Sequence, residues 1–410
     1  MATQIEYARS GVITHEIEAL SRQEGISKDT LSHRVRNGSV VIMNRNGRIV
    51  GIGKGLCTKV NVNIGTSGMC INPEQEIEKA VIAERYGADT LSDLSMGGQI
   101  QEIRRTVQDA TTLPITTVPI YQAAAKAGIP AMDDDLILRT IEEQVQEGIN
   151  SVVLHTITEN QVSLVRDKQR VLGVVSKGGS ILASYMHYHS TANPHIRYFS
   201  DILEILKERD VVLSLGNSLR SGCIHDKRDS AQKAELKTNI RLAKQAHEAG
   251  IQTIIEWSGG HVRADRIEKN VRYYKKRSRY PVFVAGPLPT DVAAGHDHMA
   301  GCVGASIASG AGVDYLCYIT PSEHLGLPNP QQVKEGLIAY RIAAHIGDSM
   351  KYGLLTDDLM VARSRRDLDW EGQFSHVLDP EEARNIRSDS GPCTMCGDFC
   401  AIRLMEQILK

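Results

Sequence analysis

Three cysteines stand close together near the end of the chain, Cys393, Cys396 and Cys400, in the run Ser-Gly-Pro-Cys-Thr-Met-Cys-Gly-Asp-Phe-Cys. Thiolates at this spacing can ligate three irons of a 4Fe–4S cluster. The fourth iron then has no protein ligand and is open to a small molecule. Reductive cleavage of S-adenosylmethionine needs such an open iron, so we expect radical chemistry to begin at this motif.

Two other interpretations of the motif stay open. A structural zinc site normally takes four protein ligands, and only three are close in sequence here. A disulfide would pair two of the cysteines and leave the third alone. The other cysteines have no ligand spacing, and most lie in apolar runs typical of small buried side chains; they are Cys57, Cys70, Cys223, Cys302 and Cys317.

Two histidines, His261 and His324, each come just after a predicted strand. Neutral imidazoles at such positions can bind a divalent metal separate from the cluster. Composition alone offers further candidates, so the residues do not choose the pair; these are His187, His189, His195, His296 and His298.

Two glycine-containing segments also follow predicted strands, Ser176-Lys177-Gly178-Gly179-Ser180 and Ser258-Gly259-Gly260-His261. Bare backbone amides beside a cationic side chain can hold a phosphate, although glycine after a strand is also ordinary turn chemistry. Arg220 follows another strand and can clamp a phosphate or carboxylate with two hydrogen bonds. The alternative for Arg220 is a surface ion pair, which would stabilise the fold little.

Short apolar strands that alternate with amphipathic helices must position these residues. The predicted strands are Lys59–Ile64, Thr90–Leu94, Ile115–Val118, Ser151–His155, Val171–Val175, Val211–Leu215, Thr253–Glu256, Val282–Ala285 and Tyr315–Ile319. The predicted helices are Glu74–Tyr86, Ile100–Asp109, Asp135–Glu147, Ala231–Ala249, Ala264–Tyr274 and Pro330–Ile346. Eight or nine such units indicate an α/β fold of the (β/α)8 barrel type, with one strand too many in the set. A doubly wound sheet is the alternative.

Functional residues of such a barrel collect where the strands end. Polar residues lie at or after the end of nearly every predicted strand: Asn61 and Asn63, Ser92 and Asp93, Tyr121, His155, Ser176 to Gly179, Asn217 to Arg220, Glu256 with His261, and His324. Some of them are caps or turn formers, but a set that recurs after so many strands predicts a site at this end of the barrel.

The repeating pattern divides the chain into three parts. Residues 1–57 are predicted to form a small α+β domain, in which helices over Thr14–Gln23 and Lys28–Arg36 precede a strand pair that turns at Asn46-Gly47. Residues 58–348 carry the barrel. Residues 349–410 are rich in charge and are predicted to form a helical, exposed arm that ends in the cysteine motif.

Composition excludes several classes of protein. The 410 residues carry a net charge of −2, and 23% are charged, which favours neither nucleic-acid nor membrane-surface binding. No apolar run approaches the roughly 18 residues of a membrane span. The N-terminal residues lack the features of a signal peptide, so we expect a cytoplasmic protein whose thiols stay reduced.

Several motifs together resemble one known family. They are Asn61-Val-Asn-Ile-Gly-Thr-Ser67, Val118-Pro-Ile-Tyr-Gln-Ala123, Gly286-Pro-Leu-Pro-Thr-Asp291, Tyr318-Ile-Thr-Pro-Ser-Glu-His-Leu-Gly-Leu-Pro-Asn329 and the terminal cysteine motif. The chain thereby resembles the thiamine pyrimidine synthase (phosphomethylpyrimidine synthase) family of radical S-adenosylmethionine enzymes, from about residue 3 to residue 404.

The resemblance implies a (β/α)8 barrel, a small N-terminal domain and a C-terminal cluster arm, in a homodimer whose arms exchange between subunits. It implies a cluster on Cys393, Cys396 and Cys400 and a second metal, zinc or another divalent ion, on His261 and His324. The implied contacts to the substrate, 5-aminoimidazole ribotide, are Asn63, Ser92, Tyr121, His155, Ser176, Lys177, Gly178, Asn217, Ser218, Leu219, Arg220 and Glu256.

The chain departs from the family's pattern in the pocket lining. Asn217-Ser218-Leu219-Arg220 replaces Asp-Gly-Leu/Met-Arg, and Glu256-Trp-Ser-Gly-Gly-His261 is one residue longer than Glu-Gly-Pro-Gly-His and lacks its proline. Phe283 aligns with a tyrosine and lacks its hydroxyl. Lys177 replaces an arginine, which removes a planar fork but keeps the charge, and Ser92 replaces a methionine contact.

Kept cysteines and histidines with a changed lining indicate a branch of the family that begins with the same radical step. We therefore expect a carbon–carbon lyase that turns aminoimidazole ribotide into 5-hydroxybenzimidazole for anaerobic cobamide lower-ligand synthesis. The alternative product is the hydroxymethylpyrimidine phosphate of thiamine. An external one-electron reductant is implied. Glu256 is expected to transfer a proton or anchor the substrate, and Asp297 to be a further acid/base group or a structural residue.

Overall fold

The computed structural model describes residues 2–168, 170–226, 228–387 and 393–409. Its chain forms two compact units, Met1–Lys351 and Tyr352–Lys410. The predicted arm, 349–410, includes residues 388–392 and 410, which lie outside the described residues.

The first unit contains a closed barrel of eight parallel strands, which confirms the predicted fold class. The barrel closes where β10 pairs with both β3 and β9. Its strands are β3 (Lys59–Ile64), β4 (Thr90–Asp93), β5 (Ile115–Thr117), β6 (Ser151–Leu154), β7 (Val212–Leu215), β8 (Thr253–Trp257), β9 (Val282–Ala285) and β10 (Tyr315–Cys317).

The strand predicted at Val171–Val175 is wrong and is the surplus one. This segment is a loop before helix α9 (Lys177–His189), and Gly173 has a φ of 66°. Val171 and Leu172 are 69% and 54% exposed, so the apolar run does not enter the barrel. Short apolar runs do not reveal their structure by periodicity, because they lack room for a diagnostic repeat.

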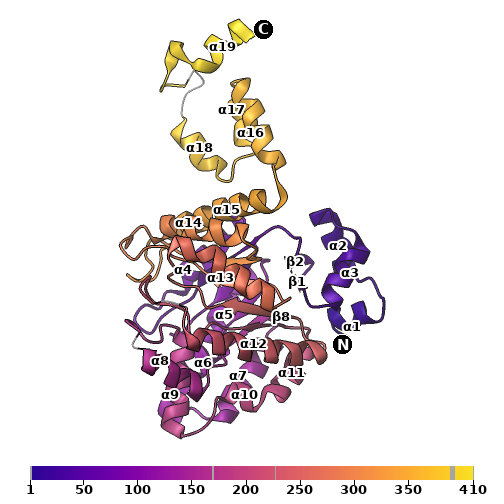
Figure 1. Cartoon of the computed structure of the whole chain (residues 1–410), viewed down its shortest axis with the longest axis vertical. Coiled ribbons are helices and arrows are strands. Elements are labelled where there is room, and N and C mark those ends of the chain that lie inside the picture. Colours follow the sequence, from indigo (N-terminus) through magenta and orange to yellow (C-terminus); the bar gives the residue numbers. More distant parts are fainter. Residues whose placement is uncertain (1, 169, 227, 388–392, 410) are drawn as a thin grey trace. The chain divides into compact units, whose positions relative to one another are not determined.

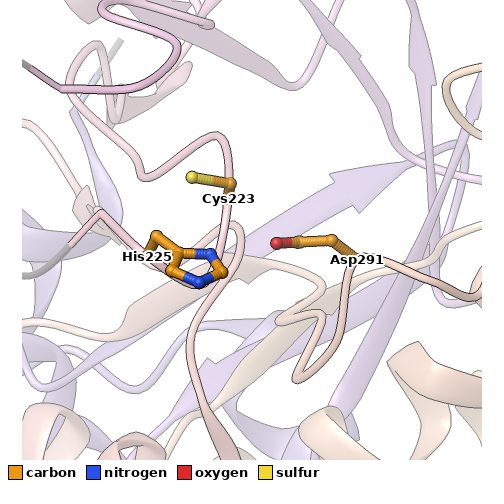
Figure 2. A group of neighbouring side chains, drawn as sticks. All are labelled: Cys223, His225 and Asp291. Atoms are coloured by element: carbon orange, nitrogen blue, oxygen red, sulfur yellow. The ribbon is translucent and has the colours of Figure 1, made fainter.

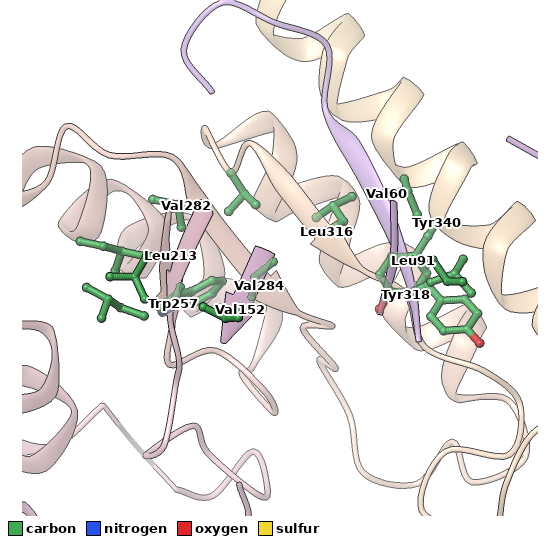
Figure 3. Packing of buried hydrophobic residues seen from close by; sticks show 14 of the residues in the cluster. Val60, Leu91, Val152, Leu213, Trp257, Val282, Val284, Leu316, Tyr318 and Tyr340 are labelled. Carbon is green, nitrogen blue, oxygen red and sulfur yellow. The ribbon is translucent and has the colours of Figure 1, made fainter. Parts of the chain in front are cut away.

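Helices surround the barrel within this unit (Figure 1). They are α4 (Pro73–Arg85), α5 (Ile100–Ala110), α6 (Pro119–Ala131), α7 (Asp134–Gln146), α8 (Glu159–Lys168), α9, α10 (Pro194–Arg197), α11 (Phe199–Lys207), α12 (Ser230–Glu248), α13 (Ala264–Arg277), α14 (Asp297–Gly310) and α15 (Pro330–Tyr352). Outward-facing strand residues pack against them in one apolar cluster, as Leu91, Val152 and Leu213 show (Figure 3). This packing hides the outer face of every strand and leaves the inner face for polar residues.

The N-terminal segment forms α1 (Gln4–Arg9), α2 (His15–Glu24) and α3 (Lys28–Arg36), followed by the antiparallel hairpin β1 (Val40–Arg45) and β2 (Arg48–Gly53). Asn46 and Gly47, at its turn, have φ values of 51° and 89°. Positive φ at both central residues gives the turn a twist that matches paired strands. The predicted strand pair and its turn are therefore confirmed.

The hairpin packs against the end of the barrel where the strands begin. Val41, Met43 and Ile52 form an apolar cluster with Val212 and Ile254 of the barrel. The side chain of Gln252 receives a hydrogen bond from the Ile42 amide (2.7 Å) and donates one to the Ile42 carbonyl (2.9 Å). The hairpin thus closes this end of the barrel, and the polar strand ends lie at the other.

The second unit is helical, with α16 (Thr356–Arg366), α17 (Trp370–Phe374), α18 (Pro380–Ile386), a 3-10 turn over Gly397–Phe399 and α19 (Ala401–Leu409). Exposed helices are what a sequence rich in charge favours, and α16 and α18 bury no residue. Across the described part of the chain, no helix combines the length and apolar character needed to span a bilayer.

Candidate active site

Polar side chains fill the inner face of the barrel around Asn61. Its Oδ1 accepts hydrogen bonds from Thr90 (2.9 Å) and Ser92 (3.0 Å), and its Nδ2 donates to Asn63 (2.8 Å). Asn63 in turn donates to the sulfur of Cys317 at 3.0 Å. Burial raises the pKa of the Cys317 thiol to about 12, so it stays protonated. This network fixes Asn63 at the wall of the site.

Helix α9 begins at the site, where Ser176 caps it by accepting from the Gly179 amide (3.2 Å). Gly178 is required there, because a Cβ would overlap the imidazole of His155, and one on Gly179 would lie 2.8 Å from the Cβ of Ser218. The helix N-terminus is therefore packed directly on His155 and Ser218. Unpaired amides and the helix dipole make this end favourable for an anion.

His155 is buried and neutral. Burial and the positive charge of Arg220 lower its pKa to about 3. Within the described residues its Nδ1 has no hydrogen-bond partner. Since buried polar atoms are nearly always paired, this nitrogen marks a place where a bound molecule or water would complete the site.

Two cations, Lys177 and Arg220, lie near this helix end. Arg220 donates to the Asn217 side chain (3.1 Å) and to the Val175 carbonyl (3.4 Å), so its guanidinium has no carboxylate partner among the described hydrogen bonds and ion pairs. The Lys177 ammonium lies 5.0 Å from the ring centroid of Tyr121. Burial and Arg220 together lower the pKa of Lys177. An anionic ligand between these cations would relieve their repulsion.

Glu256, at the end of β8, is buried inside the barrel. Its carboxylate accepts from Ser214 (2.9 Å) and from the Asn217 amide (3.2 Å). Burial raises its pKa, although both hydrogen bonds oppose the change. Phe283 is the register neighbour of Glu256 in β9 and stacks on Tyr315, with ring centroids 4.1 Å apart.

His261 is held by the loops after three strands. Its amide donates to the Ser221 carbonyl (3.1 Å), and the next amide, Val262, donates to Leu288 (2.9 Å). Gly260 precedes it with a φ of 64°, where a Cβ would overlap the Ser221 carbonyl. The His261 Nδ1 lies 2.6 Å from an oxygen of Asp291, so Nε2 is left to bind elsewhere.

His324 completes the pair from the loop after β10. It has a φ of 63°, and its Nε2 lies 3.3 Å from the Nε2 of His261. Its Nδ1 lies 3.5 Å from the carboxylate of Asp297, the buried first residue of α14. Imidazoles that ligate metals usually hold their second nitrogen against a carboxylate in this way. The donor set therefore fits a divalent metal bound by both Nε2 atoms.

A cavity of about 360 Å³ opens among these residues, within the size range of ligand pockets. Six of the predicted site residues line it: Asn63, Tyr121, Lys177, Arg220, His261 and His324. Other predicted residues are buried around or beneath it: Ser92, His155, Ser176, Gly178, Asn217, Ser218 and Glu256. Phe283 lies half-buried deep in the barrel, and Leu219 packs in an apolar cluster with Leu182 and Tyr185.

Three residues of the site escaped the sequence analysis. Glu323 lines the cavity, and burial raises its pKa although His324 and Arg220 oppose the change. Cys317 lines the cavity too, and Asp291 orients His261. The sequence does hint at two of them, since Glu323 directly precedes His324 and Asp291 ends the motif Gly286-Pro-Leu-Pro-Thr-Asp291. Their roles depend on contacts between distant loops, which no local spacing reveals.

The terminal cysteines lie on one tight turn. Cys393 and Cys400 are half-buried and Cys396 is exposed. The Gly397 amide donates to the Cys393 carbonyl (3.0 Å), and Gly397 has a φ of 52°. The structure does not bring the three sulfurs within 4.8 Å of one another. All three are free thiols on a compact turn, which fits ligands of a cluster whose irons are bound separately.

A family model and several named proteins match nearly the whole chain. Residues 3–407 match the family described as the Radical SAM ThiC family. A phosphomethylpyrimidine synthase of Methanospirillum hungatei is 42% identical over 422 residues, covering 99% of each chain. Proteins of the same name from Methanoculleus marisnigri (44%, 98% of each chain) and Geobacter metallireducens (42%, 100% of this chain and 98% of that one) are similar to it.

Proposed function

Because the chain belongs to the Radical SAM ThiC family, we propose that it cleaves S-adenosylmethionine reductively and uses the radical to rearrange 5-aminoimidazole ribotide. The observation that carries this proposal is the cavity at the polar end of the barrel. The cations Lys177 and Arg220 line it beside the N-terminus of α9. His261 and His324, whose Nε2 atoms face each other, line it too. The helix N-terminus and the two cations suit the phosphate of the ribotide, and the histidine pair suits a divalent metal.

The phosphate of the substrate is assigned to the N-terminus of α9. Lys177 and Arg220 supply positive charge there, and no ion pair to either is present among the described residues. Charge-assisted hydrogen bonds to phosphate are roughly twice as strong as neutral ones. The two cations therefore bind and orient the ribotide, while Tyr121 closes the wall beside Lys177.

Glu256 is assigned to the imidazole end of the substrate. It lies deeper in the barrel than the cations, and its raised pKa lets it hold or accept a proton. Ser214 and the Asn217 amide fix the carboxylate. Glu256 therefore anchors the amino-imidazole or moves a proton on it, and the closed barrel end excludes water.

Cys393, Cys396 and Cys400 would hold the 4Fe–4S cluster, and His261 with His324 the second metal. When bound, the cluster supplies the electron that cleaves S-adenosylmethionine, and the divalent ion adds a fixed positive charge. Asp291 and Asp297 orient the two imidazoles for this task.

The name of the similar proteins supports hydroxymethylpyrimidine phosphate as the product. A second candidate, 5-hydroxybenzimidazole, is favoured by where the departures from the family pattern lie. Asn217 binds Glu256 through its amide and the Trp257 carbonyl through its side chain (3.2 Å). Phe283 neighbours Glu256 in the sheet. Two of the altered residues, Asn217 and Phe283, thus lie beside one carboxylate, where they can change how an intermediate is held.

One experiment separates the two products. The protein is reconstituted anaerobically with iron and sulfide and given aminoimidazole ribotide, S-adenosylmethionine and a strong one-electron reductant. Mass spectrometry then identifies the product. Hydroxymethylpyrimidine phosphate supports the first candidate, and 5-hydroxybenzimidazole the second. Formation of neither product, with intact cluster absorbance, contradicts the proposed substrate.

A further inference from the structure

Three metal-ligating side chains gather outside the cavity residues described above. Cys223 and His225 lie on the loop after β7, and Asp291 lies on the loop after β9. A donor atom from each lies within 4.8 Å of the donors of the other two. Figure 2 shows the imidazole of His225 beside Cys223 and the carboxylate of Asp291 pointing toward both. One sulfur, one nitrogen and one oxygen donor therefore lie close enough together to bind a single ion.

The backbone fixes this arrangement. The Ile224 amide, between Cys223 and His225, donates to an oxygen of Asp291 at 2.9 Å. The Asp226 amide donates to the Cys223 carbonyl (3.1 Å), which closes the turn, and the Asp226 side chain accepts from the Val171 amide (2.9 Å). The two loops are thus joined before any ion binds, so the donors need little rearrangement to meet one.

The chemistry of the donors selects the kind of ion. A thiolate and an imidazole suit zinc and similar borderline-soft divalent metals, and a carboxylate completes many such sites. Three protein ligands leave one tetrahedral position open. Although Asp291 already accepts two hydrogen bonds, a carboxylate offers about four lone-pair positions, so it can bind a metal as well.

We propose that Cys223, His225 and Asp291 form a further divalent-metal site, of the zinc type, beside the His261–His324 pair. Asp291 belongs to both, because it binds the His261 Nδ1 at 2.6 Å. An ion held by Asp291 would therefore fix the same carboxylate that orients His261. Gly222, next to Cys223, lines the cavity, so the ion sits at its rim.

The test uses the full chain with Cys393, Cys396 and Cys400 all replaced by serine, so that no cluster thiolate remains. The protein is stripped of metal and titrated with Co²⁺. A thiolate-to-cobalt charge-transfer band is expected, and it should saturate at about one thiolate-bound ion per chain, because the His261–His324 pair offers no sulfur. The band should vanish in Cys223→Ser and persist in the matched control Cys302→Ser. It should also persist in His261→Ala, because that residue ligates the other metal.

His225→Ala provides an independent arm, because His225 is exposed and its replacement leaves the core intact. Loss of an outer-shell partner alone costs about 10–100-fold in affinity. Loss of this ligand should therefore weaken Co²⁺ binding by more than about 100-fold, measured by competition with a chelator. Absence of the band in the parent, its persistence in Cys223→Ser, or unchanged affinity in His225→Ala would each overturn the proposal.

Discussion

The Nε2 atoms of His261 and His324 lie 3.3 Å apart, although 63 residues separate them in the chain. Each ring has a carboxylate at its other nitrogen, Asp291 for His261 and Asp297 for His324. A divalent cation between the two Nε2 atoms would accept a lone pair from each ring. The arrangement therefore fits a divalent-metal site whose imidazoles are oriented by carboxylates of the outer shell.

Asp297→Asn tests this arrangement. Since removal of an outer-shell carboxylate typically lowers metal affinity about 10–100-fold, divalent-ion binding by the His261–His324 pair should weaken by that factor. Chelator competition measures the affinity, and the visible absorbance of the cluster should stay unchanged. Asp265→Asn, on the exposed face of α13, is the matched control. If Asp297→Asn binds the ion normally yet loses turnover, Asp297 is an acid/base group instead.

The cluster assignment predicts the effect of changing the terminal cysteines. Alanine at Cys393, Cys396 or Cys400 should abolish 5'-deoxyadenosine release from S-adenosylmethionine, because each thiolate ligates a separate iron. Chromatography of the nucleoside products measures the release. Cys302→Ser, which changes a half-buried thiol of α14, should release it at the normal rate. Release that survives in any of the alanine variants contradicts a cluster at this turn.

Lys177 is predicted to bind the phosphate of the substrate and to contribute little to binding of the rest of the molecule. A hydrogen bond to a charged group contributes about 1.5–3 kcal/mol, so Lys177→Met should raise the KM for aminoimidazole ribotide about 10–150-fold. Lys177→Arg should restore most of the affinity, since it keeps the charge. Lys126→Met, on an exposed lysine paired with Glu143, is the control. An equal loss of affinity for the dephosphorylated nucleoside would show that Lys177 does not bind the phosphate.

Gly178→Ala should destabilise the protein although alanine is the better helix former. Relief of glycine's helix penalty would stabilise by about 1 kcal/mol, but the new methyl group would overlap the buried ring of His155. Overpacking of this kind typically costs about 1–3 kcal/mol. Urea unfolding measures the change. Gly68→Ala, where the added methyl group meets nothing within 4 Å, is the control; a stabilised Gly178→Ala would show that the ring can move aside.

The raised pKa of Glu235 predicts that the free energy of unfolding depends on pH. Glu235 is buried, accepts from the Leu219 amide (3.1 Å) and the Ser258 hydroxyl (2.5 Å), and burial raises its pKa from 4.5 to about 7. Between these values the folded chain holds a proton that the unfolded chain has lost. The free energy of unfolding should therefore fall as pH rises from 4.5 to about 7, and change no further above that.

Glu235→Gln isolates this contribution. The shift corresponds to about 3 kcal/mol across the window, and glutamine, which cannot ionise, should remove that slope. Urea unfolding at several pH values measures it in both proteins. Asp210, whose pKa burial also raises to about 7, contributes equally to both and cancels. Parallel stability curves for the two proteins would contradict the raised pKa.

The barrel could be predicted from the sequence because its strands are short apolar runs separated by helical repeats. The run at 171–175 had the same composition, yet Gly173 and the exposure of Val171 make it a loop. Composition shows that a segment could form a strand. Whether it joins the barrel depends on its pairing with two neighbouring strands, which are distant in the sequence. The same limit explains why the number of strands could not be fixed.

The site was predictable where a residue lies at the end of its strand, as Asn63 does, or a few residues beyond it, as Arg220 and His261 do. It was not predictable where two loops must meet. Cys223 stands in no ligand motif, and only the approach of the loop after β9 brings Asp291 to it. Leu219 was expected at the substrate because its neighbours are, but its side chain packs into the apolar cluster around Leu182.

The hairpin of β1 and β2 has a kinetic consequence. It packs Val41, Met43 and Ile52 against the end of the barrel where the strands begin, so this end is covered. The cavity lies at the opposite end, where the strands end. Substrate and product are therefore expected to share the end of the barrel where the strands end. A product that lingers there occupies the place of the next substrate, and the turnover of such an enzyme is expected to slow as its own product accumulates.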